Sequence, residues 1–138
     1  MRILQGVDLV ELERFREVFS RHPSFAHDLY TDAERSYCHS RQHSAVHFAG
    51  RFAAKEAALK ALGIGITTGI DRAFREVEVS RTGSGRPTLH FHGWVARLSE
   101  RLRVLQCTVS ISHTANYVVA TVILLSRVGG DGPRASVG

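Results

Sequence analysis

The segment from about residue 45 to residue 62, AVHFAGRFAAKEAALKAL, constrains the fold more than any other part of the sequence. It is rich in Ala and Leu, which favour helix, and Gly63 marks its end. On a helical wheel Phe48, Phe52 and Leu59 share one stripe, while alanines cover most of the remaining circumference. A helix that is apolar or small on all sides is generally buried. We therefore expect a central helix with other elements packed closely around it.

This helix nevertheless carries four charged side chains, and Lys55 falls in the middle of the apolar stripe. The four are Arg51, Lys55, Glu56 and Lys60. Buried charges are costly unless they are paired or liganded. Two interpretations stay open. In the first, Glu56 and Lys60 form an ordinary i,i+4 pair while the other two side chains reach out to water. In the second, the three cations surround phosphates and Glu56 binds a metal cation.

The rest of the sequence predicts an α+β fold, with helices packed on a mainly antiparallel sheet. Strands are predicted over residues 3–10, 74–80, 88–91, 106–112 and 117–125. Helices are predicted over residues 12–22, 25–30 and 94–105. A capping box at Thr31 and Glu34 predicts that a further helix begins there. A Gly-rich loop is predicted over residues 63–72. We expect one domain over residues 1–126. Residues 127–138 are rich in Gly and poor in apolar side chains, so we expect a disordered tail.

Composition limits the class of protein. The chain has 138 residues, 43% of them hydrophobic and 22% charged, which is typical of a globular protein. The longest apolar stretch is far shorter than the roughly 20 residues that cross a bilayer as a helix, and two cysteines make no disulfide framework. We therefore expect a soluble cytoplasmic protein with no membrane partner. The formal net charge of +5 favours an anionic partner, although no basic run marks a nucleic-acid binder.

Two further groups of polar residues could contribute to a site. Asp8 lies in the first predicted strand and either caps the following helix or joins Glu56 at a hard-cation site. Mg²⁺ is commonly held by one or two carboxylates together with water and phosphate oxygens. Residues 110–114, Ser-Ile-Ser-His-Thr, place an imidazole and hydroxyls at a strand end. They could meet a phosphate there, or form a polar turn without a function.

Three blocks of this sequence resemble the holo-acyl-carrier-protein synthases, the small single-domain 4′-phosphopantetheinyl transferases. They are Gly6-Val7-Asp8 with Glu11 and Arg14, the stretch GRFAAKEA at 50–57 with Lys60, and Ser112-His113-Thr114. Their order and spacing match over residues 1–125. The resemblance implies the phosphopantetheinyl transferase fold. It also implies Mg²⁺-dependent transfer of 4′-phosphopantetheine from coenzyme A to a serine of an apo acyl carrier protein, with release of adenosine 3′,5′-bisphosphate.

The resemblance also implies roles for single residues. Asp8 and Glu56 would hold Mg²⁺ and, with Lys60 on the pyrophosphate, form the catalytic set. Coenzyme A would be bound by Arg51, Lys60, His113 and Thr114, with Lys60 at the pyrophosphate and Arg51 and His113, beside Thr114, at the 3′-phosphate and adenosine end. An acidic acyl carrier protein would dock on Arg14 and Arg21. His43 stands where the family has an arginine, and Lys55 matches the motif but receives no role. The family further implies a homotrimer with its sites at subunit interfaces.

Other readings of the sequence remain. The same fold could serve as a non-catalytic module that binds coenzyme A or an acidic protein, and a basic nucleic-acid binder is a weaker alternative. His39, His43 and His47 recur every four residues beside Cys38 and could line one helix face as a transition-metal site. No further metal-binding motif accompanies them, so surface histidines are the simpler interpretation.

Overall fold

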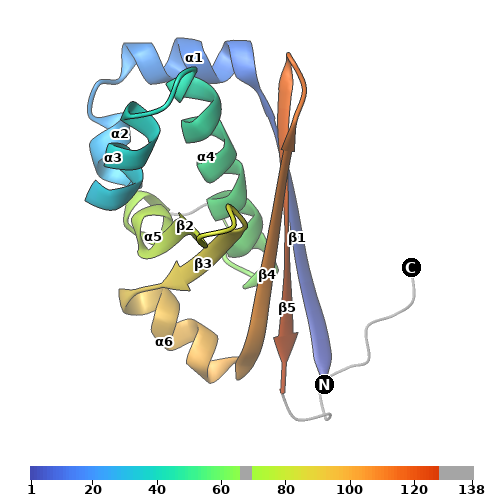
Figure 1. The fold of residues 1–138 in the computed structure, drawn as a ribbon. Coiled ribbons are helices and arrows are strands. Elements are labelled where there is room, and N and C mark those ends of the chain that lie inside the picture. Colours follow the sequence, from blue (N-terminus) through green and yellow to red (C-terminus); the bar gives the residue numbers. More distant parts are fainter. Residues whose placement is uncertain (66–69, 128–138) are drawn as a thin grey trace.

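A computed structural model describes residues 1–65 and 70–127 (Figure 1). The chain begins with β1 (Arg2–Glu11), followed by the helices α1 (Leu12–Arg21), α2 (Phe25–Leu29), α3 (Asp32–His39) and α4 (Ser44–Ala61). It continues with α5 (Ile70–Glu76), β2 (Val77–Arg81), β3 (Pro87–Phe91), α6 (Gly93–Arg101), β4 (Val104–His113) and β5 (Tyr117–Ser126). The predicted tail over 127–138 falls almost entirely outside the described residues.

The strands form two antiparallel sheets, which confirms the expected α+β class. One sheet has the order β1-β5-β4, and β2 pairs with β3 in a separate hairpin. Figure 1 shows the helices gathered on one face of the long sheet, with α4 next to it. Side chains alternate between the two faces of a strand. The apolar side chains of Ile3, Val7, Leu9, Tyr117 and Ile123 therefore share the other face, where each is between 42% and 73% exposed.

Small residues let α4 lie directly on the sheet. A Cβ at Gly6 would lie 1.8 Å from the carbonyl oxygen of Ala57, so the β1 backbone touches the helix backbone. A Cβ at Gly50 would meet the methyl groups of Ile111 at 3.3 Å and of Val118 at 3.9 Å. The alanines of α4 at 49, 53, 54, 57 and 58 are fully buried. This close approach confirms the central helix and places Glu56 beside the strand that carries Asp8.

The structure corrects two predicted boundaries. Residues 74–76 belong to helix α5 rather than to a strand, and β2 begins only at Val77. Helical geometry lets Phe74 pack on Phe52, with ring centres 5.1 Å apart. The predicted helix over 94–105 ends at Arg101, because Arg103 takes a positive φ of 52° and Val104 pairs with β5. The predicted loop over 63–72 contains residues 66–69, which are not described, and its last three residues open α5.

Candidate active site

The carboxyl groups of Asp8 and Glu56 line one small cavity of about 280 Å³. Asp8 is on the inner face of β1 and only 8% exposed. Lys60 Nζ lies 3.2 Å from Asp8 Oδ1 and 3.1 Å from the Val7 carbonyl oxygen. The other oxygen, Asp8 Oδ2, is buried and receives no hydrogen bond from a backbone N–H, a hydroxyl or a cationic side chain in the described part of the chain; the carboxyl group of Glu56 is the acidic neighbour of Asp8. Burial raises the pKa of Glu56 to about 7, helped by a hydrogen bond and repulsion from Asp8 and opposed by Lys60.

This acidic pair has the chemistry of a hard-cation site. A buried carboxylate oxygen without a donor is costly, and a nearby second carboxylate adds repulsion. A divalent cation bound between the two carboxyl groups would offset both the cost of the buried oxygen and the repulsion. No group of three or more His, Cys, Asp or Glu side chains in the described ranges is arranged to hold a metal ion. The pair therefore fits Mg²⁺, which completes its coordination with water and phosphate oxygens, better than a closed transition-metal centre.

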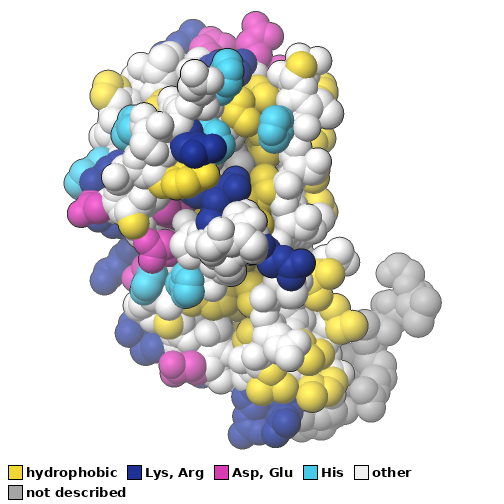
Figure 2. All heavy atoms as spheres, viewed as in Figure 1, with side chains coloured by type: hydrophobic (Ala, Val, Ile, Leu, Met, Phe, Trp, Pro, Cys, Tyr) yellow, Lys and Arg dark blue, Asp and Glu magenta, His cyan; other side chains and the backbone are white. Residues whose placement is uncertain are grey.

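A second, larger cavity of about 640 Å³ is lined by cationic and imidazole side chains. Figure 2 shows Arg and His side chains gathered on this face, between the helices and the long sheet. Its polar lining comes from Arg16, Gln42, His43, His47, Arg51, Arg81, His113 and Thr114. Arg51 is 3% exposed, and its Nε has no hydrogen-bond partner in the described part of the chain. Such a buried cation fits a phosphate group, which guanidinium binds well.

One aromatic ring organises these cations. The guanidinium carbon of Arg51 lies 4.4 Å from the centre of the Tyr37 ring, and those of Arg41 and Arg81 lie 5.6 Å from it. Burial lowers the pKa of His47, and the positive charge of Arg51 and its neighbours lowers it further. The cavity therefore concentrates positive charge, as expected for a polyanion site.

The structure groups the residues predicted from the sequence into two sets. Asp8, Glu56 and Lys60 lie together, and Arg51, His113 and Thr114 share the larger cavity. Within the described residues, no side chain lines both cavities. On the first helix, Arg14 lines the acidic cavity. Arg21, in contrast, is exposed and pairs with Glu17 at 2.5 Å.

Two sequence-based interpretations are wrong. Lys55 neither reaches water nor surrounds a phosphate, because it is fully buried and paired with Glu34. The three histidines do not share one helix face: His39 lies on α3, and His43 precedes α4 in a left-handed conformation with φ 56°. Sequence reasoning also missed Arg16 and Arg81 as cavity residues. The net positive charge was the one sequence feature consistent with them. Arg81 could not be placed from the sequence because it reaches the cavity from the β2–β3 hairpin.

Comparison with known proteins shows the family to which this chain belongs. The family model for the 4′-phosphopantetheinyl transferase superfamily matches residues 5–122. The chain is 42% identical over 120 residues to a holo-[acyl-carrier-protein] synthase of Koribacter versatilis, covering 86% of this chain and 94% of that protein. It is 35% identical over 127 residues to the synthase of Moorella thermoacetica, covering 92% and 97%. The chain therefore belongs to the holo-[acyl-carrier-protein] synthase family of that superfamily.

Solved structures agree with this assignment. The structure titled as an ACPS–CoA complex of Chronobacterium ammoniagenes has a TM-score of 0.82 and 32% identity, covering 92% of this chain and 99% of that one. A holo-(acyl-carrier-protein) synthase of Bacillus anthracis in complex with CoA (3′,5′-ADP) has a TM-score of 0.72 and 31% identity, covering 89% and 96%. The expected phosphopantetheinyl transferase fold is thus confirmed.

Proposed function

We propose that this protein transfers 4′-phosphopantetheine from coenzyme A to a serine of an apo acyl carrier protein and releases adenosine 3′,5′-bisphosphate. The serine oxygen forms a bond to the phosphorus of the phosphopantetheine group. The phosphorus–oxygen bond to the adenosine phosphate breaks, and the serine hydroxyl loses its proton. The observation that carries the proposal is the pair of neighbouring carboxyl groups, Asp8 and Glu56, in one cavity beside the ammonium group of Lys60.

Mg²⁺ is the cation that we assign to Asp8 and Glu56. When bound, it would neutralise negative charge on the pyrophosphate, which is the main requirement of phosphoryl transfer. Lys60 adds a positive charge next to Asp8, close enough to contact the same pyrophosphate. The pKa of Glu56 is raised to about 7 by burial and by Asp8, so Glu56 holds a proton near neutral pH that a bound cation would displace. The serine proton would pass either to Glu56 or to a water molecule at the site.

The adenosine end of coenzyme A would occupy the larger cavity. Arg51 supplies a nearly buried guanidinium for the 3′-phosphate, and His113 and Thr114 offer an imidazole and a hydroxyl at the end of β4. Arg81 adds a cation that the sequence did not predict. Phosphoryl groups with several negative charges match this lining better than a neutral ligand does.

The carrier protein would approach over α1. Arg14 is exposed and lines the acidic cavity, so an acidic partner bound to it lies next to the proposed reaction centre. Arg21 is also exposed but is paired with Glu17 at 2.5 Å. We therefore assign the larger share of carrier docking to Arg14.

A homotrimer would bring the cavity of Asp8 and Glu56 in one subunit next to the larger, cationic cavity of a neighbouring subunit. The uncovered sheet face exposes apolar side chains, which favours association. His113 and Thr114 also line a small cavity with Leu9 and Tyr117, which belong to that face. A neighbouring copy packed there could bring its own residues to the acidic pair. Leu9→Lys should convert the trimer to monomers in sedimentation and abolish transfer, whereas an unchanged oligomeric state would contradict this packing.

None of the helices in the described residues is long and apolar enough to cross a membrane. The cytoplasmic location expected from composition stays a prediction.

Mass spectrometry of a carrier protein tests the proposed activity. The protein is incubated with coenzyme A, Mg²⁺ and an apo carrier, and the mass of the carrier is measured. A gain of one phosphopantetheine group is expected with the unaltered protein and not with Asp8→Asn. No gain despite coenzyme A binding would instead support a non-catalytic binding module.

A further inference from the structure

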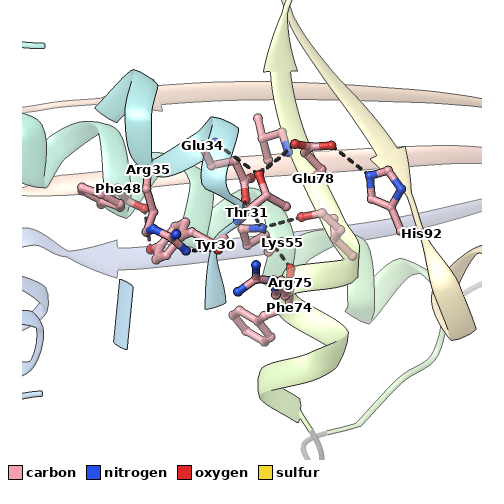
Figure 3. Close-up of polar contacts among 12 residues, drawn as sticks. Tyr30, Thr31, Glu34, Arg35, Phe48, Lys55, Phe74, Arg75, Glu78 and His92 are labelled. Atoms are coloured by element: carbon pink, nitrogen blue, oxygen red, sulfur yellow. Dashed lines mark hydrogen bonds and ion pairs between the residues drawn. The ribbon is translucent and has the colours of Figure 1, made fainter. Parts of the chain in front are cut away.

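Lys55 directly precedes Glu56 on α4, but its side chain enters the core between α3, α5 and β2 (Figure 3). The side chain is 0% exposed. Its Nζ donates to Glu34 Oε1 at 2.8 Å, to the Phe74 carbonyl oxygen at 2.9 Å and to the Val77 carbonyl oxygen at 2.5 Å. An ammonium group has three N–H donors. All three are used inside the protein, so Lys55 has none left for a phosphate.

Glu34 anchors the other end of this contact. Its Oε1 also accepts from the Thr31 backbone N–H at 2.8 Å, and its Oε2 accepts from the Val79 N–H at 2.8 Å. The carboxylate is itself 0% exposed. The Lys55–Glu34 pair therefore ties the middle of α4 to the start of α3, the end of α5 and strand β2, from which the hairpin extends.

We propose that Lys55 is a positioning residue, which through Glu34 fixes the rotation of α4 about its axis and so aims Glu56 at Asp8. The inference rests on the proposed function, because it concerns the same metal site. Side-chain ends lie about 5–6 Å from a helix axis, so a rotation of about 10° moves a carboxylate by about 1 Å. A displacement of that size is enough to spoil the geometry of a reacting centre.

Stability alone does not account for such a pair. Replacing both partners of a buried ion pair with uncharged side chains is often neutral or even stabilising, whereas removing one partner leaves an uncompensated charge. A role in orientation predicts that both kinds of change damage the metal site. It also predicts that the two residues act as one unit, since neither fixes the helix without the other.

The experiment compares Mn²⁺ binding by the full-length chain and its variants Lys55→Met, Glu34→Gln and the double variant. Free Mn²⁺ is counted by electron paramagnetic resonance, and the turnover number of transfer is measured in parallel. Residues that orient metal ligands typically change metal affinity about 10- to 100-fold when mutated. We expect each single variant to lose that much Mn²⁺ affinity. The double variant should lose no more Mn²⁺ affinity than the single variant that binds Mn²⁺ more weakly.

Tyr30→Phe is the matched control. Tyr30 is equally buried, and its hydroxyl donates to the Phe48 carbonyl oxygen on the same helix at 2.9 Å. This variant loses a buried contact of α4 but keeps the Lys55–Glu34 pair, so its Mn²⁺ affinity should not change. If it weakens Mn²⁺ binding as much as Lys55→Met does, general loosening of the core explains the effect and the inference is wrong.

The remaining outcomes separate this inference from the proposed function. A folded Lys55→Met variant with unchanged Mn²⁺ affinity and lost turnover would show that Lys55 affects transfer without positioning the metal ligands, contrary to the inference. Fully additive losses in the double variant would also contradict it. If Lys55→Met does not fold, the Mn²⁺ affinity of the double variant, which removes both charges, tests the inference: a loss supports it and an unchanged affinity contradicts it. Normal Mn²⁺ effects without any phosphopantetheine transfer would overturn the proposed function alone, and absence of Mn²⁺ binding by the unaltered chain would overturn both.

Discussion

Gly6→Ala tests whether the contact between β1 and α4 builds the site. The added Cβ would lie 1.8 Å from the Ala57 carbonyl oxygen and 2.9 Å from the Ala61 backbone nitrogen. Both are backbone atoms and cannot rotate away. The helix must therefore move off the strand by at least about 1.2 Å to reach a tolerable contact of 3.0 Å. Overpacking of this kind costs about 1–3 kcal/mol.

The same movement separates Glu56 from Asp8. A misplacement of about 1 Å can lower a rate about 100-fold, so the turnover number of folded Gly6→Ala should fall by about that factor. Gly50→Ala is the control for stability, because its Cβ meets only side-chain methyl groups, of Ile111 at 3.3 Å and of Val118 at 3.9 Å, and no backbone atom of another element. Replacing a helical Gly with Ala favours the helix by up to about 1 kcal/mol. Urea denaturation of both variants is the assay. Equal stability of Gly6→Ala and Gly50→Ala would refute the packing argument.

Three further predictions concern charge. A proton and a metal cation compete for Glu56, whose pKa is raised to about 7, so the Mg²⁺ affinity measured by calorimetry should rise with pH up to about 7 and then level off. Without metal, the folded protein binds the Glu56 proton more tightly than the unfolded chain does, so the free energy of unfolding should fall as pH rises from about 4.5 to 7. Arg51→Met should weaken coenzyme A binding at least 10-fold by loss of a charge-assisted hydrogen bond of about 1.5–3 kcal/mol, and unchanged affinity would remove the larger cavity as the nucleotide site. Arg14→Glu should weaken carrier binding mainly at low salt, more than Arg21→Glu does; equal effects in a salt titration would argue against docking beside the acidic cavity.

Local patterns predicted most of the fold. Alternation gave the long antiparallel strands, and the capping box at Thr31 and Glu34 formed as expected, with both hydrogen bonds present. The strand boundary at residue 74 was wrong because alternation in a short apolar segment does not distinguish a strand from a helix end. The helix is favoured there by long-range contacts, the packing on Phe52 and the carbonyl oxygens that Lys55 requires.

The site was only partly predictable for a similar reason. Asp8 and Glu56 could be paired from residue type and resemblance, since both lie on elements with strong local patterns. The burial of Lys55 could not be predicted from the sequence, because its partner Glu34 is 21 residues away and its two carbonyl acceptors belong to α5 and β2. Arg81 reaches the larger cavity from a hairpin whose placement depends on the whole fold. The division into two cavities likewise depends on three-dimensional packing.

In the proposed mechanism, Asp8 and Glu56 together hold one divalent cation against the pyrophosphate of coenzyme A. Crystals grown with coenzyme A and Mn²⁺ would test it directly through the anomalous scattering of the metal. We expect a single strong peak within coordination distance of Asp8 Oδ2 and a carboxylate oxygen of Glu56. A peak bound elsewhere, or coenzyme A bound with these two carboxyl groups facing each other and no metal between them, would contradict it.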